Sequence, residues 1–281
     1  RSMVANEVTE TFRAAGLSHL LAVSGLHMSV IAGGMMLLMR LLRIRRSVGN
    51  VVSAIVIVLF MWMVEFTPSV TRAGVMYLTV IIGQLFRYRS DSLNSLGLAL
   101  TIILYVSPSA IYDIGLWLSF TAVVGILCIT PRILRVLIAP FEGLPRVCYI
   151  PIRWIVNSIS ISIGCTLPLT PLLLLAFGEM SIVSPIANLF AVLPAGWMTI
   201  LGCAGALLTL VPVLGFVGNG LILLAGLLAK WLILVSELSS RIPGALLRPT
   251  DIWMIVLIAG GGILISFAIV CCSWRHVCCL L

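Results

Sequence analysis

The chain has 281 residues, of which 61% are hydrophobic and only 9% are charged, and its formal net charge is +8. A soluble domain carries about a quarter charged residues, so this composition excludes an ordinary water-soluble enzyme or binding module. Several apolar stretches are long enough to cross the roughly 30 Å hydrocarbon layer as helices, each of which needs about 20 residues. The sequence therefore predicts an all-α, polytopic membrane protein.

The first segment, residues 1–25, has a different pattern from the rest. Apolar residues recur at helical spacing from Val4 to His19, with charged residues between them, which is typical of an amphipathic helix at the membrane interface. We expect Gly16 to bend this helix and Gly25 to mark where the chain enters the bilayer. No signal sequence opens the chain, so we expect it to be the membrane domain of a longer protein.

Residues 26–281 carry the apolar runs, which predict a transmembrane bundle of about seven to nine spans. The predicted spans are 26–42, 48–66, 68–86, 93–110, 112–130, 154–177, 182–210, 217–236 and 252–272. Prolines interrupt two of them, at Pro168 and Pro171 and at Pro185 and Pro194. Broken helices at membrane depth are tolerated where the freed backbone is buried in protein or lines a watery cavity. The pattern therefore favours a transport path.

The basic residues predict the orientation. If nine segments cross, one side receives Arg40, Arg43, Arg45, Arg46, Arg87, Arg89, Arg132, Arg135, Arg146, Arg153 and Arg275. The other side receives Arg1, Arg13, Arg241 and Arg248, while Arg72 and Lys230 lie inside segments. Cytoplasmic loops carry an excess of Lys and Arg. We therefore expect the N-terminus to lie outside and the C-terminus in the cytoplasm.

An arginine inside an apolar segment is a functional hypothesis by default, because intramembrane charge is costly. In EFTPSVTRAG, residues 65–74, Glu65 and Arg72 flank a Thr-Pro turn. One interpretation is an ion pair between Glu65 and Arg72 that closes a hairpin near the headgroups. The other makes Arg72 a cation on the route of an anionic substrate. Both interpretations stay open.

The stretch GLSHLLAVSGLH, residues 16–27, raises the question of catalysis. Its AVSG is one residue away from the G-x-S-G of intramembrane serine proteases, but a serine nucleophile needs a base within hydrogen-bond reach. His19 and His27 approach Ser24 only if the local helix is broken. We therefore expect no catalytic residues, and we keep an intramembrane serine hydrolase using Ser24 and His27 as the alternative. Another interpretation is two neutral histidines at a glycine-rich helix crossing.

The sequence also predicts no metal or cofactor. The terminal CCSWRHVCC, residues 271–279, contains His276 but lacks the C-x-x-C spacing of common zinc sites. We interpret it as the end of a membrane helix. No nucleotide-binding loop or dinucleotide fingerprint occurs, so energy for transport must come from a partner or from an ion gradient.

Four blocks of the chain resemble the ComEC/Rec-type competence domain, in the order of that family. They are TFRAAGLSHLLAVSGLHMSVIAGG (11–34), TPSVTRAGVM (67–76), SPSAIYDIGLWLSFTAVVGIL (107–127) and PLTPLLLLAFGEMSIVSPIANLFAVLP (168–194). The resemblance implies a non-enzymatic channel that passes one DNA strand through the cytoplasmic membrane of a naturally transformable bacterium. Full-length members also carry an oligonucleotide-binding fold and a metallo-β-lactamase-like nuclease domain, whose H-x-H-x-D-H motif is not in this sequence.

The resemblance also implies partners and site residues. The partners are single-stranded DNA, membrane lipid, an external DNA receptor and nuclease domain, and a cytoplasmic ATP-driven translocase. The family's motif positions correspond to Gly16, His19, Ser24, Gly25, His27, Arg72, Ser119, Phe120 and Asn188. A strand path needs hydroxyls, amides, few cations and aromatic rings. The candidates for its wall or mouth are Ser18, His19, Ser24, His27, Ser69, Thr71, Arg72, Trp117, Ser119, Phe120 and Asn188. A transporter for a small anionic solute remains a further alternative.

Overall fold

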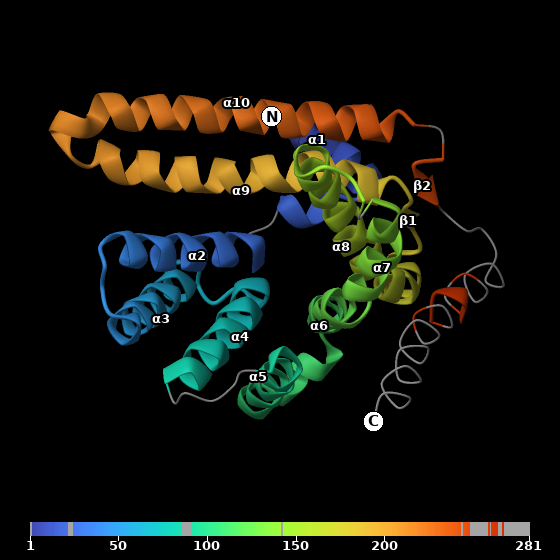
Figure 1. Ribbon diagram of the computed structural model, residues 1–281, viewed down its shortest axis with the longest axis horizontal. Coiled ribbons are helices and arrows are strands. Elements are labelled where there is room, and N and C mark those ends of the chain that lie inside the picture. Colours follow the sequence, from blue (N-terminus) through green and yellow to red (C-terminus); the bar gives the residue numbers. More distant parts are fainter. Residues whose placement is uncertain are drawn as a thin grey trace. The chain divides into compact units, whose positions relative to one another are not determined.

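Figure 1 shows the computed structural model of the chain, and contacts between its residues divide the chain into two compact units. Unit 1 comprises Arg1–Leu17, Trp117–Phe190 and Ser236–Leu281, and unit 2 comprises Ser18–Leu116 and Ala191–Val235. The structure describes residues 2–21, 25–85, 91–141, 143–242, 244–247, 258, 260–263 and 266. Most of the predicted span 252–272 and all of the terminal cysteines lie outside the described residues.

Helices dominate the described residues. They are α1 (Ser2–Ala14), α2 (Gly25–Leu41), α3 (Arg46–Met63), α4 (Pro68–Leu85), α5 (Ser92–Val106), α6 (Ile114–Cys128), α7 (Thr130–Ile138), α8 (Arg146–Phe177), α9 (Ser184–Thr209) and α10 (Gly215–Ser240). Short 3-10 turns lie at Ser18–Leu20, Pro108–Tyr112, Ala139–Phe141 and Pro212–Leu214. A two-stranded antiparallel sheet joins β1 (Met180–Ser181) to β2 (Leu246–Leu247). The predicted all-α class is confirmed.

Five helical segments of the described chain are long and apolar enough to cross a membrane. They are Arg46–Met63, Ile114–Phe141, Arg146–Phe177, Ser184–Thr209 and Gly215–Ser240. Gly25–Leu41, Ser69–Leu85 and Ser92–Val106 are apolar but shorter. Large apolar side chains stay exposed along these helices, as expected of a protein whose main solvent is lipid. The chain is a multi-pass membrane protein, and this criterion does not confirm the predicted seven to nine spans.

The helix breaks predicted at the prolines are not confirmed. Helix α8 runs from Arg146 to Phe177 through three prolines, and α9 runs through Pro194. Pro185 lies in the first turn of α9, where the missing N–H would have had no helical partner in any case. Prolines therefore interrupt neither helix.

Neighbouring glycines explain how α8 tolerates two of its prolines. Each proline removes the helical hydrogen bond to the carbonyl four residues earlier, which frees the carbonyl oxygens of Gly164 and Leu167. A β-carbon at Gly125 of α6 would overlap the Gly164 oxygen, and one at Gly262 would lie 3.3 Å from the Leu167 oxygen. Both glycines thus let a neighbouring backbone close over a freed carbonyl. Buried in this way, the carbonyls need no break in the helix.

Unit 2 has its core where α2, α3 and α4 lie against one another (Figure 1). The buried side chains of this core are Met28, Ala32, Ile57, Met61, Val70 and Ile81. Gly74 of α4 gives Met61 its space, because a β-carbon there would overlap the Met61 sulfur. Asn50 of α3 donates a hydrogen bond to Gln84 of α4 over 3.3 Å. Apolar packing and one amide pair therefore hold this helix group together.

In unit 1, the C-terminal end of helix α1 is held by contacts with the rest of the unit. The bend expected at Gly16 is present, with φ of +74°, and Phe12 and Leu17 on either side are buried. The Ser181 hydroxyl of β1 donates a 2.7 Å hydrogen bond to the Ala14 carbonyl. An ion pair joins Arg13 to Glu179, beside the same strand. The end of α1 is thus fixed by β1, and its location at the membrane interface stays a prediction.

Candidate functional site

Among the described arginines of unit 2 the most buried is Arg72, in the first turns of α4. It is 8% exposed, and its Nη1 donates a 3.0 Å hydrogen bond to Oδ2 of Asp113. The other carboxylate oxygen of Asp113 accepts a 2.9 Å hydrogen bond from the Gly115 N–H at the start of α6. One carboxylate therefore both caps α6, where a negative charge is favourable, and neutralises a buried guanidinium.

Gly115 makes room for this pair. A β-carbon at Gly115 would lie 3.1 Å from Oδ1 of Asp113 and 3.4 Å from both terminal nitrogens of Arg72. The guanidinium thus lies directly against the first turn of α6. Its Nε is buried and has no hydrogen-bond partner among the described residues. Arg72 therefore keeps one unused donor beside its ion pair.

The predicted pairing of Arg72 with Glu65 is wrong in the described structure. Glu65 is exposed and adopts φ of +55° in the turn that precedes α4, and the carboxylate that meets Arg72 is that of Asp113. The Thr71 hydroxyl is engaged in the same turn, where it lies 2.9 Å from the Phe66 carbonyl. The left-handed turn thus leaves Glu65 at the surface while α4 carries Arg72 inward.

Unit 1 contains a second polar cluster, centred on Asn188 of α9. Its Nδ2 donates to the Ser162 hydroxyl of α8 over 2.9 Å and to the Ser184 hydroxyl over 3.2 Å. The Oδ1 atom of Asn188 is buried without a hydrogen-bond partner among the described residues. Gly16 lies against this cluster, because a β-carbon there would be 2.6 Å from the β-carbon of Ser184. Two blocks that are far apart in the sequence therefore meet here.

Hydroxyl groups continue along α8. Ser158, Ser162, Thr166 and Thr170 recur every four residues and so share one face of the helix. The described hydroxyls of Ser158 and Thr170 return their hydrogen bonds to carbonyls of their own helix, over 3.0 Å and 2.9 Å. The donors of Ser158 and Thr170 on this polar face are therefore satisfied within the helix.

A further buried hydroxyl belongs to Thr130, at the start of α7. Its Oγ1 has no hydrogen-bond partner among the described residues, and a β-carbon at Gly164 of α8 would overlap it. Sequence reasoning missed Thr130 and Ser162, although the four-residue spacing of hydroxyls in the α8 run was the signal for the latter. It also missed Asp113 as the partner of Arg72.

The remaining predicted site residues have varied environments. Ser18 and His19 are exposed; His27, Ser69 and Ser119 are half-buried; Trp117 is exposed and Phe120 is buried. Ser24 lies outside the described residues. Phe120 packs in the interior, so its ring offers no open face to a base in this structure. No group of three or more His, Cys, Asp or Glu side chains suited to a metal ion occurs among the described residues.

Comparison with known proteins gives the family. The competence protein family matches residues 1–275. The chain is 30% identical over 120 residues to ComE operon protein 3 of Bacillus subtilis (strain 168), which is 43% of this chain and 16% of that protein. It is 32% identical over 146 residues to an uncharacterized protein of Aquifex aeolicus (strain VF5), 49% of this chain and 34% of that protein. No solved structure matches. Because the family match covers nearly the whole sequence, this chain belongs to the competence protein family.

Proposed function

We propose that this chain is a transmembrane channel domain through which a competent bacterium imports single-stranded DNA across its cytoplasmic membrane. The family match over residues 1–275 and the long apolar helices support a membrane role in competence. The observation that carries the proposal is that buried polar atoms without hydrogen-bond partners among the described residues include Asn188 Oδ1 and Thr130 Oγ1 in unit 1 and Arg72 Nε in unit 2. Each such group costs about 1–3 kcal/mol, so a purely structural bundle would not need them.

These atoms match the chemistry of a DNA strand. The Asn188 carbonyl accepts hydrogen bonds and suits the exocyclic amines of bases, whereas the Thr130 hydroxyl and Arg72 Nε–H suit phosphate oxygens. Hydroxyls and amides hold a phosphate without the strong attraction of many cations. A transport path must bind its cargo weakly enough for the cargo to move on. Asp113 serves this need, because it neutralises Arg72 until a phosphate competes for the guanidinium.

Orientation and partners are part of the same proposal. With arginine-rich loops in the cytoplasm, the N-terminus lies outside and a strand enters from that side. The chain itself acts without catalysis. An external receptor and nuclease domain supply the single strand, and a cytoplasmic ATP-driven translocase pulls it. These assignments concern the whole protein, whereas the matched parts cover only 16% of the Bacillus subtilis relative and 34% of the Aquifex aeolicus relative.

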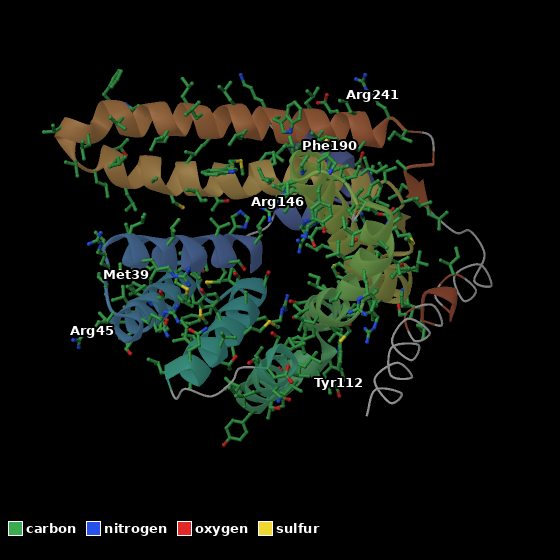
Figure 2. All side chains as sticks on the ribbon, in the orientation of Figure 1. Met39, Arg45, Tyr112, Arg146, Phe190 and Arg241 are labelled. Atoms are coloured by element: carbon green, nitrogen blue, oxygen red, sulfur yellow. The ribbon has the colours of Figure 1, made fainter. Side chains whose placement is uncertain are left out.

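Uptake of labelled DNA by competent cells tests the proposal. The full-length protein would carry Arg72→Glu or Asn188→Leu, and membrane abundance would be measured in parallel. The matched controls are Arg45→Glu, since Arg45 projects outward (Figure 2), and Asn50→Leu, which removes a buried amide outside the predicted site. For both site variants we expect normal membrane abundance and normal binding of DNA outside the cell. The internalised label should fall about tenfold or more. The reason is that the like charge introduced by Arg72→Glu, or the amide lost in Asn188→Leu, costs about 1.4 kcal/mol or more. Equal losses in site and control variants would contradict the proposal.

Two further measurements separate the alternatives. A hydrolase that uses Ser24 and His27 would lose essentially all turnover in Ser24→Ala, whereas a channel wall would lose only part of its flux. Labelled strands of increasing length distinguish a polymer path from a transporter of small anions, because only an open path conducts long strands. Import that stops at a mononucleotide would favour the small-solute transporter. His27→Ala, compared with wild type, tests whether that half-buried side chain belongs to the path.

A further inference from the structure

A pocket with a different chemistry lies between α7 and α8 in unit 1. Its volume is about 400 Å³, and it is lined by Leu134, Tyr149, Ile150, Arg153, Trp154 and Asn157. Five of these residues come from α8, where spacings of three and four residues place them on one helix face. None of them belongs to the polar atoms assigned to the DNA path. The α7–α8 pocket thus needs its own explanation.

The length of α8 locates this pocket relative to a bilayer. Helix α8 has 32 residues. At about 1.5 Å per residue it spans roughly 48 Å, whereas the hydrocarbon core is only about 30 Å thick. With Phe177 taken as one edge of the hydrocarbon core, about 20 residues reach back to Ser158, which leaves the helix between Arg146 and Asn157 for the headgroup layer. The cation of the α7–α8 pocket therefore lies at the depth of lipid phosphates.

The polar groups of the pocket suit a phosphate. Arg153 is exposed, and its guanidinium carbon lies 6.0 Å from the centre of the Tyr149 ring, which restrains the side chain through a cation–π contact. A guanidinium offers five N–H donors in a planar fork that matches phosphate oxygens. Asn157, one turn further along α8, adds an amide donor to the same pocket. The pocket thus presents a positioned cation and a neutral donor.

The surroundings of the pocket distinguish lipid from nucleic acid. Trp154 is 45% exposed and Ile155 is 40% exposed, and both lie on the hydrocarbon side of Arg153 along α8. Acyl chains cover such side chains, whereas the sugars and phosphates of a DNA strand would leave them in water. Tryptophan and tyrosine beside arginine are typical of the headgroup level of a membrane. The amphipathic helix α7, with Arg135 exposed beside Val136, adds basic charge at the same place.

We propose that the α7–α8 pocket binds the phosphate of an anionic phospholipid. Arg153 and Asn157 donate to the phosphate oxygens, and the acyl chains pass Trp154 and continue along the hydrocarbon side of α8. Basic pockets beside membrane helices bind anionic headgroups by the same physics. The site is independent of the proposed strand import, since it uses none of the residues of that path. It predicts that this end of α8 is anchored by lipid.

Lipid retention by the full chain tests the proposal. The protein would be purified from nanodiscs of equal parts phosphatidylglycerol and phosphatidylcholine, and the lipid kept by each variant would be counted by native mass spectrometry. We expect wild type to retain phosphatidylglycerol preferentially and Arg153→Gln to lower that preference about tenfold, the effect of one charged hydrogen bond. Arg45→Gln is the matched control, because it removes an exposed arginine of unit 2 and should keep the wild-type preference.

A second variant and two competing ligands test whether the pocket binds the phosphate of a lipid. Asn157→Leu leaves the net charge unchanged and should lower the preference for phosphatidylglycerol by a smaller factor than Arg153→Gln does. A loss in this variant would show that the pocket itself, and not the overall charge of the protein, retains the lipid. Equal retention in Arg153→Gln and wild type would overturn the proposal. It would also be overturned if millimolar inorganic phosphate, or a single-stranded oligonucleotide, displaced the retained phosphatidylglycerol. Equal losses in Arg153→Gln and Arg45→Gln would mean non-specific attraction and would overturn it too.

Discussion

Removing the two members of the Arg72–Asp113 pair should have unequal effects on the free energy of unfolding. The Arg72 side chain is 10% exposed, and that of Asp113 is 43% exposed. The substitution Asp113→Ala leaves a buried guanidinium without its counter-charge and removes the acceptor of the Gly115 N–H. Arg72→Met leaves a carboxylate that reaches the surface and still caps α6. Asp113→Ala should therefore be the more harmful change.

The structure sets the magnitudes of the two effects. Stripping a buried charge of its partner costs about 3–5 kcal/mol, and the exposure of Asp113 places this pair at the lower end, about 3 kcal/mol. Arg72→Met removes the buried charge itself and leaves a carboxylate that is 43% exposed and so still hydrated, which is why this change should cost about 1 kcal/mol or less. The double variant Arg72→Met/Asp113→Ala leaves no charge unpaired. It should recover about 2 kcal/mol relative to Asp113→Ala alone.

Unfolding by sodium dodecyl sulfate in mixed micelles, followed by tryptophan fluorescence, measures these differences. Asp113→Asn is a useful control, because its side-chain carbonyl can still accept the Gly115 N–H and so isolates the charge from the cap. Two results would refute the reasoning. One is a cost for Arg72→Met as large as that for Asp113→Ala, and the other is a double variant less stable than Asp113→Ala.

The glycines that lie close to a neighbouring helix, and the polar cluster around Asn188, give further predictions for the same unfolding assay. Gly125→Ala should cost about 1–3 kcal/mol through overpacking against α8. Gly83→Ala, where nothing lies within 4 Å, should be neutral or stabilising, and equal costs for the two would disprove the close approach. Gly205→Ala should also destabilise, because its β-carbon would lie 2.9 Å from a carbonyl oxygen of α10. Gly16→Ala should cost at least about 1–2 kcal/mol, the penalty of a left-handed backbone, with more from the overlap. Asn188→Ala should cost only about 0.6–1.7 kcal/mol, and a much larger loss would indicate a role beyond its two hydrogen bonds.

The positions of the helices were largely predictable from the sequence. The predicted span 68–86 is α4 at Pro68–Leu85, and the predicted span 182–210 is α9 at Ser184–Thr209. The physical reason is that a bilayer demands about 20 apolar residues, so hydropathy marks a span with little dependence on its neighbours. Local breakers also helped. Gly178, with φ of +68°, is the C-cap of α8, whose last residue, Phe177, is the predicted limit of the span.

The partners of the polar side chains were not predictable in the same way. Glu65 is seven positions from Arg72 and was the natural candidate, whereas Asp113 is separated from Arg72 by 41 positions. Hydropathy indicates that a helix lies in the membrane. It says little about which other helices pack against that helix, or about how the helix is rotated around its own axis. Asn188 illustrates the same limit, because its residue type indicated a hydrogen bond but only the packing of α8 against α9 selects Ser162.

The prolines of α8 show how a correct local rule led to a wrong structural prediction. Proline does free a backbone carbonyl, and the sequence alone suggested that such a carbonyl must meet water in a broken helix. In the structure, Gly125 and Gly262 cover the two freed carbonyls with neighbouring backbone, so α8 stays helical. Weak C–H···O contacts from glycine suit this geometry. Support for a transport path therefore shifts from the prolines to the buried polar atoms of Asn188, Thr130 and Arg72, which packing leaves without partners among the described residues.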